Sequence, residues 1–104
     1  MTNKEELKKL FSRMKDKTNL IALSQKDIDS IVHLGTEISL KPKKNAEAKG
    51  ALIFIEGTKN LTSEEIQNMA EKITRNLPEH AKILCGLRID NSIKNNITNA
   101  VYVY

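Results

Sequence analysis

Residues 49–66, KGALIFIEGTKNLTSEEI, form the stretch of this 104-residue chain that decides its fold. Positions 51–56, ALIFIE, do not alternate between apolar and polar, which is typical of a strand covered on both faces. Turn residues follow, and Thr62 with Glu65 three positions later is a capping box that begins a helix. The stretch therefore predicts a central strand, a turn and a helix over residues 62–77.

Two further strands are predicted downstream, at residues 82–88 and 97–103, with the polar stretch 91–96 between them. A strand–helix–strand unit requires a right-handed crossover and makes its two strands parallel. The short polar link before Ile97 permits an antiparallel return of the last strand.

Upstream of the quoted stretch, the pattern predicts a strand followed by a helix. Residues 20–23 are apolar in succession and predict a short strand. Ser24 is suited to cap a helix over residues 25–40. Gly35 lies on the apolar stripe of this helix, where the missing side chain permits close packing on the sheet.

An amphipathic helix is predicted at the N-terminus, over residues 4–15. Thr2 or Asn3 can cap it, and a glutamate three residues later completes a capping box. Its apolar stripe has the i, i+3, i+4, i+7 spacing of one helix face and consists of Leu7, Leu10, Phe11 and Met14.

These elements predict an α+β fold, a two-layer α/β sandwich with a mixed four-stranded sheet. The order along the chain is β-α-β-α-β-β, with the N-terminal amphipathic helix in addition. Helices 25–40 and 62–77 are expected on one face of the sheet. The other face is covered either by the N-terminal helix or by a second subunit. We divide the chain into residues 1–17, the N-terminal helix, and residues 18–104, one compact unit.

Composition is that of a globular domain: 39% of the residues are hydrophobic and 29% are charged. No apolar run approaches the roughly 20 residues that a membrane-spanning helix needs, and the N-terminus does not resemble a secretory signal. The single cysteine, Cys85, allows no internal disulfide. We therefore expect a soluble, cytoplasmic protein without a membrane partner.

The formal net charge of +4 comes entirely from the first half of the chain. Residues 1–50 contain 11 Lys and Arg against 7 Asp and Glu, whereas residues 51–104 contain 6 of each. Such basic runs are commonly solvated surface, and the alternative is contact with an acidic partner. For that alternative the candidate contact residues are Lys41, Lys43, Lys44, Lys49, Lys9 and Arg13.

Other residues with chemical potential are expected to be structural. Cys85 is expected to be a buried, inert thiol because no partner histidine is in view. His33 and His80 have no second ligand at metal spacing and are expected at the surface. Tyr102 and Tyr104 share one face of the last strand, where covering the sheet is favoured over stacking on a single-stranded nucleic acid.

Two motifs resemble the C-terminal domain of the FtsZ/tubulin-like GTPase family. In residues 49–66, as in that family, a Gly-led apolar strand ends in a Gly turn, and an Asn/Asp-Leu-Thr helix start follows. Residues 78–90, PEHAKILCGLRID, resemble the family's next strand, with matches at Ala81, Ile83, Gly86, Ile89 and Asp90. The resemblance covers residues 19–104, most strongly from Gly50. It implies a free-standing domain of this type, without the GTPase domain.

The resemblance does not imply nucleotide hydrolysis by this chain. The family's phosphate loop is Gly-rich and lies in a separate N-terminal domain, whereas the four glycines here are isolated. Thr58 stands where the family's turn has its second Gly, so contacts of that turn are not carried over. We expect no catalytic, cofactor-binding or metal-binding residues.

Three hypotheses for the function follow from these observations. The one we favour is a non-catalytic interaction module that binds a tubulin-like GTPase, its partners or a second copy of itself. The alternative is a basic nucleic-acid-binding domain, whose affinity falls steeply with salt. A small-molecule enzyme is disfavoured because neither an acid/base pair nor a nucleophile with its base is visible.

Overall fold

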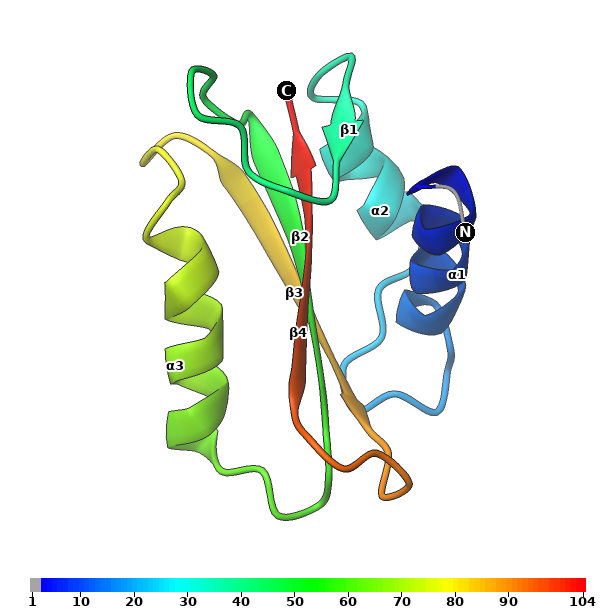
Figure 1. Ribbon diagram of the computed structural model, residues 1–104. Coiled ribbons are helices and arrows are strands. Elements are labelled where there is room, and N and C mark those ends of the chain that lie inside the picture. The colour runs from blue at the N-terminus through cyan, green and yellow to red at the C-terminus, as the bar shows by residue number, and fades with distance from the viewer. Residues whose placement is uncertain (1–2) are drawn as a thin grey trace.

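A mixed β-sheet with helices on both faces forms the structure, a computed structural model that describes residues 3–104 (Figure 1). Neighbouring strands lie in the order β1-β4-β2-β3. The elements follow the chain in this order: α1 Asn3–Met14, α2 Gln25–Val32, β1 Ile38–Ser39, β2 Gly50–Gly57, α3 Ser63–Thr74, β3 Lys82–Ile89 and β4 Ile97–Val103.

Strand β2 is the best-covered strand, since all eight of its residues are buried. It runs parallel to β3, with Gly50 opposite Lys82. It runs antiparallel to β4, with Leu52 opposite Val101. The predicted central strand is confirmed, and so are the parallel crossover through α3 and the antiparallel return of the last strand.

Alternate residues of β2 face two separate hydrophobic cores, as expected from the period of two in a strand. The first core lies between the sheet and the helices α1 and α2, and its buried members are Leu10, Met14, Leu23, Ile28, Ile31, Leu52, Phe54, Val101 and Val103. The second lies between the sheet and α3, and its buried members are Ile53, Ile55 and Leu87. The N-terminal helix therefore covers a face of the sheet, as one of the two predicted alternatives stated.

Reciprocal capping boxes begin α2 and α3. The sequence predicts the box of α3 and the Ser24 cap of α2, and the structure adds the reciprocal bond at α2. The backbone N–H of Asp27 donates to the Ser24 hydroxyl at 3.1 Å, and the Asp27 carboxylate accepts from the backbone N–H of Ser24 at 2.9 Å. Thr62 and Glu65 form the same pair of bonds at the start of α3. Thr2 and the side chain of Asn3, the predicted caps of α1, lie outside what the structure describes.

The strand predicted at residues 20–23 is wrong. Ile21 alone of these residues reaches the sheet, through an isolated antiparallel bridge to Leu87 at the outer edge of β3. Leu20 is 69% exposed, whereas Leu23 is buried in the first core. The apolar run is divided between solvent, a sheet edge and the helical core because this segment connects α1 to α2.

The helix predicted over residues 25–40 ends at Val32, and the chain then enters the sheet as β1. The backbone N–H of Glu37 donates to the carbonyl oxygen of Tyr104 at 3.0 Å, and the N–H of Tyr104 donates back to Glu37 at 2.8 Å. Gly35 permits this approach, since a Cβ atom there would collide with the carbonyl oxygen of Tyr104. Pairing with the far end of the chain thus overrides a local helical pattern.

Helices α2 and α3 lie on opposite faces of the sheet, so the prediction that they share a face is wrong (Figure 1). That prediction assumed that α2 connects two parallel strands. Instead, β1 pairs antiparallel with β4, and the crossover rule applies only to the unit β2–α3–β3. The α+β class, the mixed four-stranded sheet and the N-terminal helix are confirmed, but the layers number three and not two.

Candidate interaction surface

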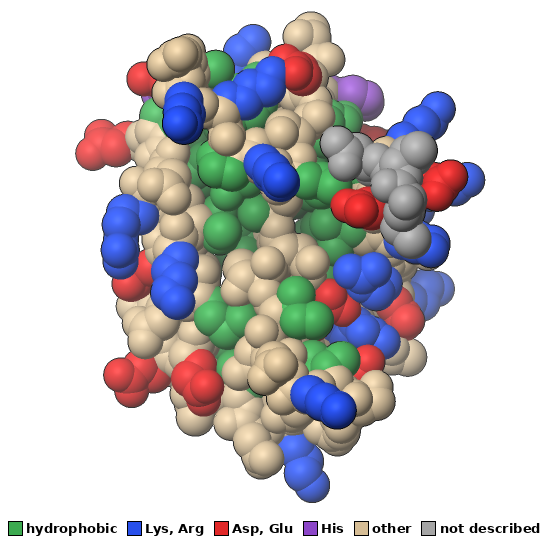
Figure 2. All heavy atoms as spheres, viewed as in Figure 1, with side chains coloured by type: hydrophobic (Ala, Val, Ile, Leu, Met, Phe, Trp, Pro, Cys, Tyr) green, Lys and Arg blue, Asp and Glu red, His purple; other side chains and the backbone are tan. Residues whose placement is uncertain are grey.

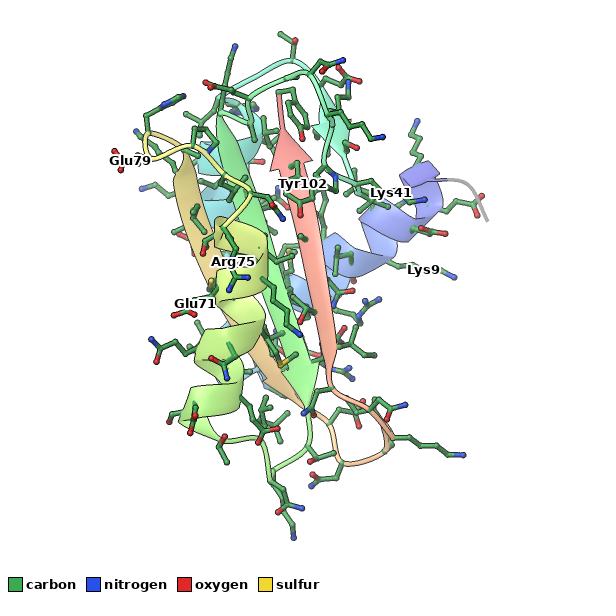
Figure 3. All side chains as sticks on the ribbon, turned by 60° about the vertical axis from the view of Figure 1, so that its left-hand side comes forward. Lys9, Lys41, Glu71, Arg75, Glu79 and Tyr102 are labelled. Carbon is green, nitrogen blue, oxygen red and sulfur yellow. The ribbon has the colours of Figure 1, made fainter. Side chains whose placement is uncertain are left out.

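The basic residues predicted to contact a partner fall on two elements. Helix α1 carries Lys9 and Arg13, and the connection from β1 to β2 carries Lys41, Lys43, Lys44 and Lys49. Figure 3 shows Lys9 and Lys41 on the same side of the sheet, the side of α1. The structure thus places Lys9 and Lys41 on a common side, although 31 other residues separate them in the sequence.

Lys43 is held by contacts within the domain. Its ammonium group forms an ion pair with Glu37 and lies 5.3 Å from the centre of the Tyr104 ring. Its backbone N–H donates to the Tyr104 hydroxyl at 2.8 Å. Lys43 therefore holds the basic connection against Tyr104, at the end of the last strand. Its charge is already partly neutralised by these contacts.

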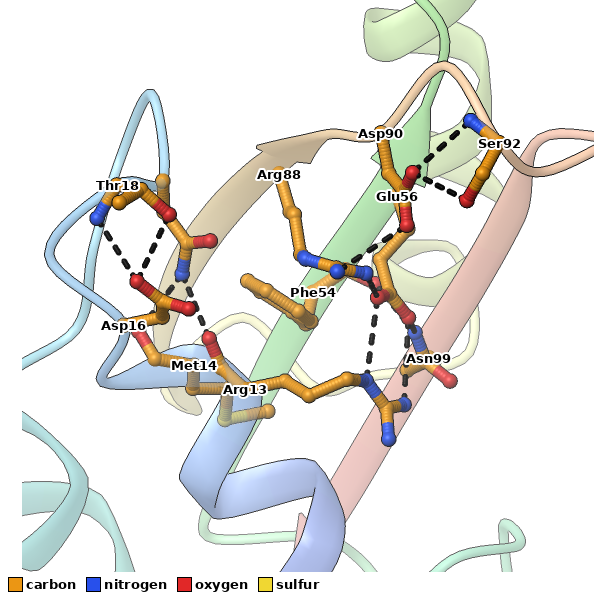
Figure 4. Close-up of polar contacts among 11 residues, drawn as sticks. Arg13, Met14, Asp16, Thr18, Phe54, Glu56, Arg88, Asp90, Ser92 and Asn99 are labelled. Carbon is orange, nitrogen blue, oxygen red and sulfur yellow. Dashed lines mark hydrogen bonds and ion pairs between the residues drawn. The ribbon is translucent and has the colours of Figure 1, made fainter.

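Arg13 is also committed to an internal partner, the buried carboxylate of Glu56 (Figure 4). Glu56 is 3% exposed. Its Oε2 atom accepts from Arg13 Nε at 3.1 Å and from Arg88 Nη1 at 2.9 Å. Its Oε1 atom accepts from Asn99 Nδ2 at 2.8 Å and from Arg13 Nη2 at 3.3 Å. Four hydrogen bonds thus satisfy the only acidic residue of β2.

The charge state of Glu56 follows from these contacts. Burial raises the pKa of this carboxyl, because a charge is costly away from water. Hydrogen bonds from Arg13, Asn99 and Arg88 outweigh burial, so the pKa lies below its ordinary value of 4.5. Glu56 is therefore ionised at neutral pH and ties α1 to β2, β3 and β4.

A groove of about 450 Å³ lies between α1 and β4. Helix α1 lines it with Glu6, Lys9 and Leu10, and β4 lines it with Thr98 and Ala100. Figure 2 shows this side of the molecule, with Lys and Arg side chains interspersed with Asp and Glu side chains along α1 and apolar side chains visible beside the strand. Of the six predicted contact residues, Lys9 and Arg13 line this groove.

Cys85 is exposed on β3, which corrects the expectation that it is buried. α3 packs on Ile53 and Ile55 of the central strand and leaves the outer strand partly open at this position. Partial burial nevertheless raises the pKa of the Cys85 thiol, which lowers its thiolate fraction at neutral pH.

The histidines and Tyr102 lie where the sequence predicts, whereas Tyr104 lies one residue beyond β4. His33 and His80 are both exposed. Tyr102 is buried against the sheet, on the side of β4 seen in Figure 3, and burial raises the pKa of its hydroxyl. The expectation that Tyr102 covers the sheet is confirmed.

A family model described as the FtsZ family, C-terminal domain, matches residues 32–103, which is well over half of the chain. The chain belongs to the FtsZ family. The matched residues begin at the end of α2 and reach the end of β4, so the whole sheet of this FtsZ-type domain lies within the match. The resemblance drawn from the two sequence motifs is confirmed.

Two solved FtsZ structures from M. jannaschii share the fold. A point mutant of FtsZ has a TM-score of 0.62 and an FtsZ dimer described as empty has 0.65, each at 20% sequence identity. Each comparison covers 99% of this chain but only 41% and 40% of the respective FtsZ chain. The chain thus spans about two fifths of the length of these FtsZ structures. A search of curated proteins found no match.

Sequence reasoning missed two features of this surface. The Glu56 cluster joins residues from four elements, and the one available signal was a carboxylate at the end of an otherwise apolar strand. No sequence pattern predicts the groove beside β4, because the groove depends on where β1 and α1 lie relative to the sheet. None of the helices in residues 3–104 is long and apolar enough to cross a membrane.

Proposed function

We propose that this FtsZ-family chain is a non-catalytic protein-interaction module that binds a tubulin-like GTPase, or a second copy of itself, in the cytoplasm. The observation that carries the proposal is the match to the C-terminal domain of the FtsZ family over residues 32–103. A domain of this type offers a sheet and three helices as a scaffold for contacts with other proteins.

The non-catalytic character is supported by the glycine positions. A phosphate-cradling loop needs several closely spaced glycines before a helix N-terminus. The four glycines of this sequence, Gly35, Gly50, Gly57 and Gly86, are each isolated. The purified chain is therefore expected to leave GTP intact.

Internal ion pairs divide the six candidate contact residues into two groups. Lys43 and Arg13 have acidic partners within the domain, Glu37 and Glu56. The ion pairs formed within residues 3–104 do not involve the other four. These four, which we propose as the contact residues of this surface, are Lys9, Lys41, Lys44 and Lys49.

Co-sedimentation tests the proposal directly. FtsZ from the same organism is polymerised with GTP and pelleted with the purified chain, and sedimentation equilibrium of the chain alone measures self-association. Enrichment in the FtsZ pellet, or a concentration-dependent dimer, is the expected result. A chain that stays in the supernatant and remains monomeric at high concentration contradicts the proposal.

Nucleic-acid binding is the competing function, supported by the exposed lysines of the connection between β1 and β2. Counterion release makes such binding fall steeply with salt. Replacement of Lys41, Lys43 and Lys44 by Glu is expected to abolish it, and a fluorescently labelled single strand titrated at two salt concentrations measures it. An affinity that does not change with salt concentration would exclude nucleic-acid binding as the function.

A further inference from the structure

Strand β4 has an edge that is only partly occupied. β1 pairs with it through two residues, Ile38 opposite Val103 and Ser39 opposite Tyr102. No strand in the described part of the chain pairs with residues 97–101 on that side. Unpaired N–H and C=O groups at a strand edge are a template for pairing with another extended segment.

The direction of the backbone groups identifies which residues are available. The N–H and C=O groups of Tyr104 bind Glu37, on the side of β1. In an antiparallel ladder, alternate residues point their backbone groups to the same side. The N–H and C=O groups of Ala100 and Thr98 therefore point away from β2, toward the free edge. Both residues line the groove between α1 and β4.

Helix α1 turns this edge into a recognition groove. Leu10 and Leu40 line it with apolar surface, and Lys9 stands on the α1 side. A strand added beside β4 would place alternate side chains against the surface formed by Leu10, Leu40 and Lys9. Backbone hydrogen bonds then supply affinity, and contacts with this surface supply specificity for the side chains, as in other cases of strand addition to a sheet edge.

Lys9, which lines the groove, and Lys41, next to the lining residue Leu40, outnumber the single acidic lining residue Glu6 and favour an acidic segment. Arg13 is already neutralised by Glu56, and Glu37 is neutralised by Lys43. Lys9 and Lys41 both lie on the α1 side (Figure 3). Neither takes part in the ion pairs formed within residues 3–104. A carboxylate on an incoming strand would give them a partner.

A second copy of the chain fits this edge less well. Antiparallel pairing of two β4 edges about a two-fold axis would place both α1 helices on the same face of the joined sheet. Both Lys9 side chains would then lie on that same face, and like charges repel.

We propose that the free edge of β4 at Thr98 and Ala100 binds an extended acidic segment of a partner protein as a fifth strand, with its carboxylates toward Lys9 and Lys41. The inference rests on the proposed function, because it names the surface through which the interaction module works.

Selection from a phage-displayed library of random twelve-residue peptides, with the full chain as bait, supplies the probe. The enriched peptides are expected to be acidic. Amide hydrogen exchange, followed by NMR, is expected to slow at Thr98 and Ala100 when such a peptide is added. No enrichment, or enriched peptides that leave exchange at these two amides unchanged, overturns the proposal. Slow exchange there in the concentrated chain without peptide also overturns it, in favour of self-association.

Two variants locate the contact. Ala100→Pro removes an N–H that points to the free edge, while the bonds from β4 to β2 are kept. We expect it to weaken peptide binding by at least about tenfold, because a backbone bond is lost and the ring blocks the edge. Lys9→Glu changes a helix residue and leaves the backbone of β4 intact, and it should weaken peptide binding about three- to tenfold. Lys8→Glu on the same helix is the control and should not weaken binding. Unchanged binding in both Ala100→Pro and Lys9→Glu contradicts the proposal.

Co-sedimentation separates this inference from the proposed function. If folded Ala100→Pro still pellets with FtsZ polymers as the unmodified chain does, the proposed function stands and the β4 edge is not its surface. If acidic peptides bind at the edge but neither FtsZ nor a second copy associates, the edge inference stands and the proposed function fails.

Discussion

Arg13 of α1 and Glu56 of β2 are joined by two hydrogen bonds, at 3.1 and 3.3 Å, although 43 positions separate them in the sequence. The contact fixes the N-terminal helix on the sheet near the C-terminal end of β2. Arg88 and Asn99 bind the same carboxylate from the neighbouring strands. One acidic side chain thus organises four elements.

Glu56→Gln is expected to destabilise the fold by about 1–3 kcal/mol, because Arg13 and Arg88 lose their common counterion in a partly buried setting. The loss is smaller than for a fully buried pair, because both arginine side chains keep contact with water. Urea unfolding measures the change. Arg75→Ala, at the exposed end of α3, is the matched control and should change stability little.

Stability should fall in acid, and Glu56 should contribute to that fall. The pKa of Glu56 is lower in the folded chain than in the unfolded chain, so its contribution is complete above about 4.5 and is lost as the pH falls through the folded value. Thermal unfolding between pH 7 and pH 3 should show a shallower decline for Glu56→Gln. The decline should not vanish, because the pKa values of Asp16 and Asp90 are lowered as well, chiefly by hydrogen bonds from Thr18 and Ser92. Equal slopes for the two proteins would refute the role of Glu56.

Met14→Ala should cost about 2–5 kcal/mol, as expected for truncation of a fully buried side chain. Met14 is 0% exposed and lies in the core between α1, α2 and the sheet. Met69→Ala on α3 is the comparison, because Met69 is only partly buried. Chemical denaturation should rank Met14→Ala well below Met69→Ala in stability, and the reverse order would contradict the packing described.

Deletion of residues 1–17 tests whether residues 18–104 are a compact unit. The deletion removes Leu10 and Met14 and exposes the face of Leu52 and Phe54 to water. We expect the shortened chain to lose cooperative unfolding and to bind a hydrophobic dye. A sharp thermal transition with dispersed NMR signals would instead establish residues 18–104 as an independent domain.

Gly35→Ala should destabilise the fold by about 1–3 kcal/mol, because the added methyl group meets the backbone of Tyr104, which cannot move without breaking the pairing of β1. Gly57→Ala is the matched control. There the new methyl group would meet side-chain atoms of Leu61 and Asn96, at 2.7 and 2.8 Å, and these side chains can rotate away. In calorimetry, the thermal unfolding midpoint of Gly35→Ala should be lower than that of Gly57→Ala.

The parts of the fold that could be predicted are those specified by neighbouring residues. Thr62 with Glu65 predicts the start of α3, and Ser24 predicts the start of α2. The continuous apolar run of β2 likewise predicts a central strand. In contrast, the conversion of the predicted helix end into β1 depends on Tyr104, which no local pattern around Glu37 reveals.

The candidate surface shows the same division. The basic residues were visible in the sequence, but their availability was not. Lys43 and Arg13 are neutralised by Glu37 and Glu56, and only the folded chain brings those charges together. The free edge at Ala100 depends on how few residues β1 contributes to the sheet, a length that follows from tertiary packing.

The position of β4 between β1 and β2 has a consequence for the order of synthesis. Of the strands described, β4 is translated last, yet it is the only one that connects β1 to the rest of the sheet. A ribosome must therefore release residues up to Val103 before the sheet can close. Until then the nascent chain holds β2 with one edge unpaired, and such an unpaired strand edge is prone to aggregation.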